Sequence, residues 1–211
     1  MPVRTAVERA LNRSIAGSAF VVLLFAVAGA QTAQTKTTKP SAPESYCTST
    51  GGTVETRVPA YGTNGPIADW LKLSGSEEFC QYMSSSDDSR IHLSLETLYS
   101  PQPTLAALAY YAAEAWNGQG EGNPASLYCT QLGGSDQFGG TTGAGGGWVT
   151  RHSYDQALEA CIFPDNSTID SWGLFYHSDG IIRGIDLSTV LKYADPYGDK
   201  KADAEKSSDP K

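Results

Sequence analysis

The stretch Tyr46-Cys47-Thr48-Ser49-Thr50-Gly51-Gly52 decides the fold, because the same pattern returns as Tyr128-Cys129-Thr130-Gln131-Leu132-Gly133-Gly134. A second cysteine follows each copy at a similar distance, Cys80 in the first and Cys161 in the second, with an aromatic residue two positions later. Self-similarity of this kind indicates a repeated supersecondary unit. The sequence therefore predicts two tandem units, residues 46–100 and 123–194.

The second copy carries the clearer local signals. Asn123 is a good helix cap, Pro124 suits the first helical position, and the following Gly-Gly pair stops a helix. We therefore expect a helix over 124–132. Residues 159–163 and 169–176 flank a Pro-Asp-Asn-Ser turn and contain Ile, Phe, Trp and Tyr, as a hairpin would. Each unit is accordingly expected to be α+β, one short helix packed on a small antiparallel hairpin or sheet.

The region between the copies, residues 101–122, contains a strongly apolar segment. Residues 104–116 combine good helix formers with a Thr cap and are followed by a glycine-rich stop. A helix that is apolar nearly all round is usually buried, so we expect a connecting strut between the two units. Insertion into a membrane is the alternative, but the segment is shorter than the ~20 residues a spanning helix needs and has no cationic face.

The N-terminus has the features of an export signal. Three arginines lie in residues 1–14, residues 15–28 are almost wholly apolar, and Ala28-Gly29-Ala30 has the small-x-small pattern of a cleavage site. We expect a signal peptide over residues 1–30 and a mature chain beginning at Gln31. No cysteine stands at the cleavage site for acylation, so a soluble periplasmic or secreted protein is expected.

Two further segments have the composition of disordered chain. Residues 31–45 are rich in Thr, Ser, Gln and Pro, and residues 195–211 are charged and lack apolar periodicity. Such segments cannot bury enough apolar surface to offset the entropy of ordering. We expect a linker before the first unit and a solvated tail after the second.

The charge balance argues against two classes of partner, nucleic acid and anionic lipid. The formal net charge is −8, and the leader holds three arginines against one glutamate, so the remainder carries −10. Binding to nucleic acid or to anionic lipid needs clustered Lys and Arg. We therefore expect no nucleic acid partner and no stable membrane insertion, and we interpret the acidity as a solvated surface.

The four cysteines are Cys47, Cys80, Cys129 and Cys161. An even number in an exported chain indicates two disulfides, whereas a zinc site would need short Cys-x-x-Cys spacings. Four cysteines allow three connectivities, and the repeat is compatible with all of them. A disulfide closing a loop of this size stabilises by about 3–4 kcal/mol in the chain-entropy model.

The histidines are the main candidates for catalysis. His92, His152 and His177 have Ser and Asp nearby, as a nucleophile–base–carboxylate site would need, but neither a nucleophile elbow nor a zinc-binding His pair accompanies them. When the copies are aligned on Ile91 and Ile169, His92 falls opposite Asp170. We therefore expect surface or packing histidines and no catalytic, cofactor or metal site.

Residues 133–147 hold eight glycines and invite comparison with phosphate-binding loops. The Gly-Lys-Ser/Thr ending is missing and no clear helix follows. A flexible surface loop is expected, and Trp148 at its end is a candidate binding lip.

The second copy also resembles a known family. The residues that carry the likeness are Asn123-Pro124-Ala125-Ser126, Tyr128-Cys129, Gly133-Gly134, Cys161, Phe163-Pro164-Asp165, Ser167 and Trp172. Over about 123–176 they are similar to the small exported domain of unknown function, family three-three-three, often labelled hemolysin. The first copy is degenerate, because it lacks the Asn-Pro start and the Phe-Pro-Asp turn.

Domains of this family often stand alone, which implies that each disulfide closes within one copy, as Cys47–Cys80 and Cys129–Cys161. Many members carry further cysteines after the tryptophan, and these are absent here. The label names no mechanism, so the resemblance implies a fold and a compartment but no catalytic residues.

The leading hypothesis is a non-enzymatic binding or envelope-associated module with an unknown protein or envelope ligand. A membrane-active hemolysin-like toxin and an unrecognised hydrolase are the alternatives.

Overall fold

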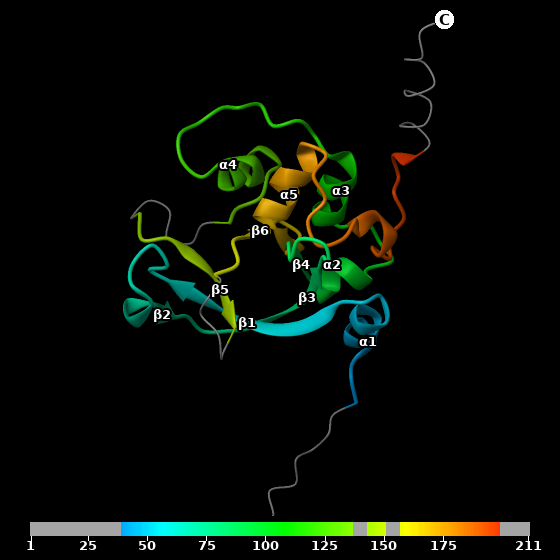
Figure 1. Cartoon of the computed structure of the whole chain (residues 1–211), viewed down its shortest axis with the longest axis horizontal. Helices are drawn as coiled ribbons and strands as arrows, with labels where there is room; N and C mark the ends of the chain where they lie inside the picture. The colour runs from blue at the N-terminus through cyan, green and yellow to red at the C-terminus, as the bar shows by residue number, and fades with distance from the viewer. Residues whose placement is uncertain (1–38, 137–142, 151–156, 199–211) are drawn as a thin grey trace, which may run out of the picture. The chain divides into compact units, whose positions relative to one another are not determined.

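The computed structural model describes residues 39–136, 143–150 and 157–198 (Figure 1). The expected signal peptide, most of the expected linker, His152 and the tail from residue 199 lie outside the described residues. Part of the glycine stretch, residues 137–142, also lies outside them.

The elements occur in the following order. They are α1 (Ala42–Ser49), β1 (Thr53–Tyr61), the 3-10 helix η1 (Ile67–Asp69), β2 (Leu71–Lys72), β3 (Glu77–Met83), β4 (Arg90–Ser94), α2 (Leu95–Tyr99), α3 (Leu105–Ala112), α4 (Pro124–Gln131), β5 (Gly146–Thr150), β6 (Ala160–Ile162), β7 (Thr168–Asp170), α5 (Ser171–Ser178) and the 3-10 helix η3 (Leu187–Thr189). The expected α+β class is confirmed.

Side-chain caps set the helix starts. The Asn123 side chain accepts hydrogen bonds from the backbone N–H groups of Ala125 and Ser126, so α4 begins where the sequence predicts. Helix α1 begins at Ala42, inside the stretch expected to be a disordered linker. There Ser41 and Glu44 form a reciprocal capping box, which satisfies backbone donors at the helix start.

The second strand of the expected hairpin, residues 169–176, is shorter than predicted. Strand β7 ends at Asp170 because the Asp170 side chain accepts from the Gly173 N–H and caps α5. Strand β4 ends at Ser94, whose hydroxyl caps α2 by accepting from the Thr97 N–H. In both halves a short strand is therefore followed by a helix, and the expectation of strand up to residue 176 is wrong.

The strands form one antiparallel sheet in the order β2-β1-β3-β4-β7-β6, and β5 pairs with the free side of β1. Trp148 on β5 also exchanges two backbone hydrogen bonds of 2.8 Å with Leu158, just before β6. The sheet thus closes into a ring, which can be followed in Figure 1 through β1, β3, β4, β6 and β5. Closure pairs backbone groups that an open sheet would leave exposed at its edges.

The two halves share this sheet. Leu93 of β4 pairs with Ile169 of β7, so strands of the first half continue into strands of the second. Helix α3 is not a strut between separate units. It ends at Ala112, before the left-handed Ala113, and its buried residues join the same core as α2 and α5.

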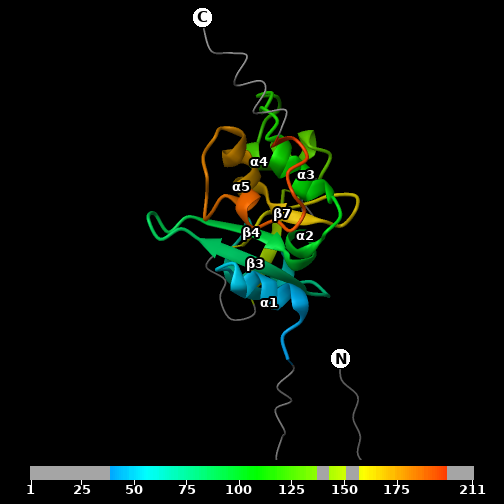
Figure 2. The same ribbon diagram turned by 90° about the vertical axis from the view of Figure 1, so that its right-hand side faces the viewer.

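Both disulfides close within one half, as expected. Cys47 of α1 is bonded to Cys80 of β3, and Cys129 of α4 is bonded to Cys161 of β6. Figure 2 shows α1 beside β3, and α4 next to α5. Each bridge therefore fixes one helix to the sheet.

The Gly-Gly pairs have a structural explanation. The first glycine of each pair has a positive φ, +90° at Gly51 and +85° at Gly133, which ends the helix. The second lies against the disulfide: a Cβ on Gly52 would be 2.3 Å from Cys80 Sγ, and one on Gly134 would be 2.4 Å from Cys161 Sγ. The repeated motif is thus a helix stop followed by space for a disulfide.

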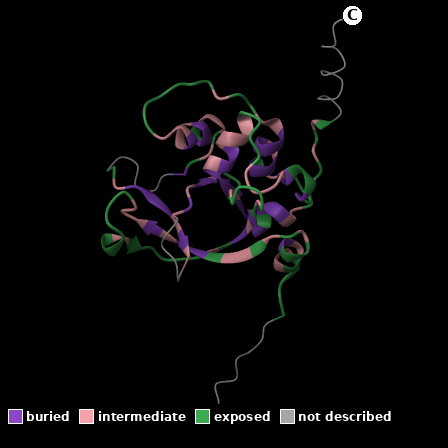
Figure 3. Ribbon diagram, viewed as in Figure 1, coloured by how far each residue is buried: buried purple, intermediate pink, exposed green. Residues whose placement is uncertain are grey.

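Alternate residues along the strands face opposite sides of the sheet. Cys80, Tyr82, Ile91, Leu93 and Ile169 face outward and form the main core with the helices. Figure 3 shows that buried residues follow both the strands and the helices packed on them. The opposite side chains face the inside of the ring, and they carry the candidate sites.

Candidate functional site

The inside of the ring is filled at its middle. Phe79, Leu158 and Ala160 are buried there, and Trp148 packs edge-on against Phe79 with ring centroids 5.6 Å apart. This plug separates two cavities, which lie toward opposite ends of strands β3, β4 and β7. We call them the acidic groove and the arginine pocket.

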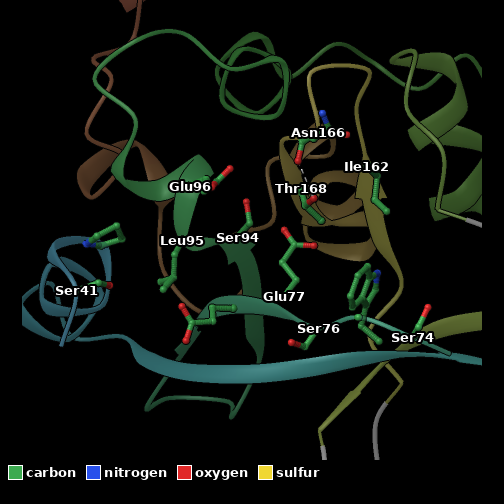
Figure 4. Close-up of a pocket in the computed structure, with 14 residues that line it drawn as sticks. Ser41, Ser74, Ser76, Glu77, Ser94, Leu95, Glu96, Ile162, Asn166 and Thr168 are labelled. Carbon is green, nitrogen blue, oxygen red and sulfur yellow. Dashed lines mark hydrogen bonds between the residues drawn. The ribbon is translucent and has the colours of Figure 1, made fainter. Parts of the chain in front are cut away.

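The acidic groove has a volume of about 670 Å³. Its walls come from the start of α1, the segment before β3, the junction of β4 and α2, and the hairpin of β6 and β7. The lining residues are Ser41, Pro43, Ser74, Gly75, Ser76, Glu77, Glu78, Ser94, Leu95, Glu96, Trp148, Ile162, Asn166 and Thr168. Figure 4 shows the Glu77 side chain extending into the groove between Ser94 and Thr168.

The charge of this groove has one sign. Glu77, Glu78 and Glu96 line it, and its lining residues include neither Lys, Arg nor His. Burial raises the pKa of Glu77 and the charge of Glu96 adds to this effect, while a hydrogen bond with Thr168 opposes it. The groove therefore favours a positively charged ligand group.

Trp148 occupies the position that the sequence suggests for a binding lip. It lies on β5, where it pairs with Pro59 of β1, and its ring reaches the acidic groove. It is half-buried, so one part of the ring packs on the plug and another part remains accessible. The groove thus combines carboxylates, hydroxyls and an aromatic surface.

The arginine pocket is smaller, with a volume of about 370 Å³. Its lining residues are Arg57, Arg90, His92, Ala157, Leu158, Glu159, Asp170, Trp172 and Arg183. Sequence reasoning missed this group. One available signal was the scarcity of arginine, since only four arginines follow Arg13 and three of them line this pocket.

A buried polar network forms the floor of the pocket. The Arg57 guanidinium is 2.7 Å from Glu55 Oε2 and donates to the Trp148 carbonyl at 3.0 Å. Burial alone would raise the pKa of Glu55, but hydrogen bonds and charge from His92 and Arg57 lower it to about 2. Glu55 therefore remains an ionised carboxylate, paired with Arg57, throughout the physiological pH range.

His92 belongs to the same network. Its Nδ1 is 3.4 Å from Asp170 Oδ2, and its Nε2 faces the Gln81 amide at 2.9 Å and Arg57 Nη2 at 3.2 Å. Burial lowers the pKa of His92, but Asp170 and Glu55 outweigh burial and raise it. Both ring nitrogens thus face side chains of the protein's own strands.

The alignment of the two copies on Ile91 and Ile169 needs correction. Ser94 and Asp170 cap α2 and α5, and an alignment of the copies on these caps places Leu93, rather than Ile91, with Ile169. His92 is not equivalent to Asp170 but is its neighbour across the two strands. His177 lies elsewhere and stacks on the Tyr110 ring with centroids 3.8 Å apart.

Within the described ranges, no group of three or more His, Cys, Asp or Glu side chains is arranged to hold a metal ion. Nor does any described helix have the length and apolar character needed to cross a bilayer.

Residues 120–178 match the family model described as Domain of unknown function (DUF333). The DUF333 match runs from just before α4 to the end of α5, and so includes the Cys129–Cys161 bridge, β5, β6 and β7. Neither the curated proteins nor the solved structures contain a match to the chain. The match names a domain without assigning it an activity.

Proposed function

We propose that this protein is an exported, non-enzymatic binding module and that the acidic groove is its principal ligand site. The observation that carries the proposal is the groove itself, where three glutamates and Trp148 line about 670 Å³ beside hydroxyl and amide groups. This volume lies within the usual range for ligand sites, about 300–1,000 Å³. The ligand class follows from the lining.

The ligand we propose is a peptide segment that carries lysine or arginine. Glu77 and Glu96 would pair with its cationic group, and partial desolvation in the groove strengthens such a pair. Leu95, Ile162 and the Trp148 ring offer apolar surface for the side-chain stem. Aromatic residues beside cations add cation–π attraction.

A non-enzymatic role is supported by the surroundings of His92. Its two ring nitrogens face Asp170 on one side and Gln81 and Arg57 on the other, so a hydroxyl nucleophile occupies neither position. A triad mechanism would need the base to contact a nucleophile. The hydrolase alternative is tested by a screen of ester, peptide and glycoside substrates with the purified protein.

We also propose that the two halves are tandem copies of one hemolysin-labelled domain, the first degenerate. Each half has a helix, a disulfide, a Gly-Gly stop and a strand followed by a capped helix. The pairing Thr53 with Gln81 in the first half matches the bridge of Ser135 with Ile162 in the second. An ancestral DUF333 domain duplicated within the chain would explain this correspondence.

We propose a periplasmic or secreted location and no lytic activity. Two disulfides suit an oxidising compartment. The apolar helix α3 has its Ala106, Ala107, Tyr110 and Tyr111 buried in the core, so it would become available to a membrane only after unfolding. The toxin alternative requires that exposure.

The test is calorimetric titration of the oxidised protein with a trilysine peptide and, separately, a triglutamate peptide. We expect binding of trilysine and none of triglutamate. The double variant Glu77→Gln/Glu96→Gln should weaken trilysine binding at least about tenfold, since each lost charged pair is worth about 1.5–3 kcal/mol when partly buried. Glu121→Gln, at an exposed residue outside the groove, is the matched control. Equal affinity of both variants for trilysine would contradict the proposal.

A further inference from the structure

We infer that a cationic peptide binds the acidic groove as an added β-strand, paired with the open edge of the sheet at residues 74–78. The ligand is an extended segment of another polypeptide, so this binding mode deepens the function proposed for the groove and rests on it. Three features of the described residues support it: a gap in the sheet, unpaired backbone along one side of the gap, and carboxylates beside that backbone.

The sheet has a gap where the groove lies. Strand β4 pairs with β3 from Phe79 to Met83 and leaves the sheet at Ser94, where α2 begins. Glu77 and Glu78, the first two residues of β3, therefore pair with β1 on one side and have no partner in β4 on the other. Both glutamates line the groove. The groove thus occupies the place that a longer β4 would take.

The backbone just before β3 is unpaired as well. The Leu73 N–H donates to the Pro59 carbonyl at 2.8 Å, but the backbone groups of residues 74–76 make no hydrogen bond with any described residue. All three of these residues line the groove. Open strand edges of this kind can recruit a further strand from another chain. Five consecutive residues, 74–78, therefore lack a partner strand on the groove side.

The opposite side of the gap is closed by a side chain. The Thr168 N–H, at the start of β7, donates to Thr97 Oγ1 of α2 at 3.0 Å. Figure 4 shows Ser76 and Glu77 on one side of the groove and Asn166 and Thr168 across from them. Helix α2 thus supplies an acceptor to β7 but none to residues 74–76. An incoming strand would pair on the β3 side.

The carboxylates beside this edge select the charge of the ligand. Glu77 and Glu78 are neighbours in a strand, so their side chains point to opposite faces of the sheet. A strand added alongside would therefore meet a carboxylate on either face, with Glu96 also lining the groove. Within the part of the chain that the structure describes, none of these three glutamates forms an ion pair. They can pair with lysine or arginine of the ligand.

The same edge continues beyond the groove with exposed apolar residues. Leu73 is 42% exposed, and Leu71, in the edge strand β2, is 62% exposed. Apolar side chains on an uncovered edge favour pairing with another chain. A ligand that alternates lysine with a β-branched residue would combine charge for the glutamates with apolar surface for the leucines. Such a sequence also favours the extended conformation.

The probe is the pentapeptide acetyl-Lys-Val-Lys-Val-Lys-amide, which spans ~17 Å when extended, the length of five strand residues. Its matched control has the same side chains and charge but carries a methyl group on every backbone nitrogen, which removes the donors. Calorimetry measures the Kd of each peptide for the oxidised protein. We expect the methylated peptide to bind at least about tenfold more weakly, because it loses two or three backbone hydrogen bonds to the edge.

Amide hydrogen exchange, followed by NMR, locates the bound peptide. A strand pairs with its neighbour through every second residue, so alternate N–H groups within 74–78 should exchange at least about fivefold more slowly in the complex. Residues 85–88, in the exposed turn between β3 and β4, lie outside the groove and serve as the internal control. Their exchange should not change.

Each outcome has a distinct meaning. Equal Kd for the two peptides, with or without slower exchange at 74–78, would overturn the added strand and leave the groove as a site for cationic side chains. Unchanged exchange at 74–78 in the complex would overturn it too. Binding of neither peptide would contradict the proposed function itself. Slower exchange at 74–78 that grows with protein concentration in the absence of peptide would assign the edge to a second copy of the chain, against the inference.

Discussion

The second glycine of each Gly-Gly pair is predicted to be required for an unstrained disulfide beside it. In the Gly134→Ala variant the new Cβ would lie 2.4 Å from Cys161 Sγ, 2.9 Å from Cys129 Sγ and 3.3 Å from the Ile162 carbonyl. The sulfurs are covalently fixed and the carbonyl is part of the backbone, so no flexible side chain can move away. Either the bridge fails to form or the helix shifts away from the sheet.

The magnitude follows from the loop that the bridge closes. Cys129 and Cys161 are 32 positions apart, and a loop of this size gives about 3.7 kcal/mol in the chain-entropy model. If the bridge fails to form, the protein loses most of the stabilisation that the disulfide contributes. If the bridge forms under strain, overpacking lowers the free energy of unfolding by about 1–3 kcal/mol. We therefore expect Gly134→Ala to be destabilised by about 2–4 kcal/mol.

The neighbouring glycine supplies the matched control. Gly133 has a positive φ of +85° but nothing within 4 Å of its added Cβ, so substitution there meets only the backbone preference. Gly133→Asn should cost less than about 1 kcal/mol, because asparagine tolerates the left-handed region.

The assay is urea unfolding of the two variants and the wild type, combined with a count of free thiols in the denatured protein. Equal stability of Gly134→Ala and the wild type, with both bridges intact, would refute the reasoning about the close approach. The equivalent test at Gly52 should give the same result for Cys47–Cys80.

Four further predictions follow from the structure. Asp170→Ala should lose about 2–3 kcal/mol in urea unfolding, because it removes the cap of α5 and leaves His92 without its acceptor, whereas Asp170→Asn keeps the cap and should lose less. The pKa of Glu55 falls from 4.5 to about 2 on folding, so its contribution is complete above pH 4.5 and is lost as pH falls toward 2; wild-type urea midpoints should decline in that window more than those of Glu55→Gln. Dye release from anionic liposomes should be absent with the oxidised protein and unchanged by dose, and dose-dependent release at micromolar concentration would support the toxin instead. Mass spectrometry of the exported protein should find Gln31 as its first residue, and an intact Met1 would disprove cleavage.

Local signals in the sequence were reliable where they depended on nearby residues. The start of α4 at Asn123-Pro124 and the cap of α3 at Thr104 were predicted, and both caps are present. The capping box of α1 was also readable, because Ser41 stands three residues before Glu44, but the composition of the surrounding segment suggested disorder. Capping outweighs composition there because the following helix is anchored by Cys47.

Patterns of apolar residues were less reliable at the ends of strands. The segments 169–176 and 91–99 mix apolar and polar residues in a way that suits either a strand or a helix. The structure divides each of them at a capping residue, Asp170 or Ser94. The boundary between strand and helix depends on a hydrogen bond from the backbone N–H three residues later to the capping side chain. The alternation of apolar and polar residues does not reveal this bond.

By itself the sequence determined the features that involve residues a few positions apart or the repeated Cys and Gly landmarks: the helix caps, the helix stops, the α+β class and, with the family resemblance, the disulfide pairing. Only the tertiary structure decided that both halves share one closed sheet, because that depends on the pairing of Leu93 with Ile169 and of Trp148 with Leu158. These registers join strands far apart in the chain, and local propensity does not encode them. The arginine pocket depends on the same closure, since it unites Arg57, Arg90 and Arg183 from three separate segments.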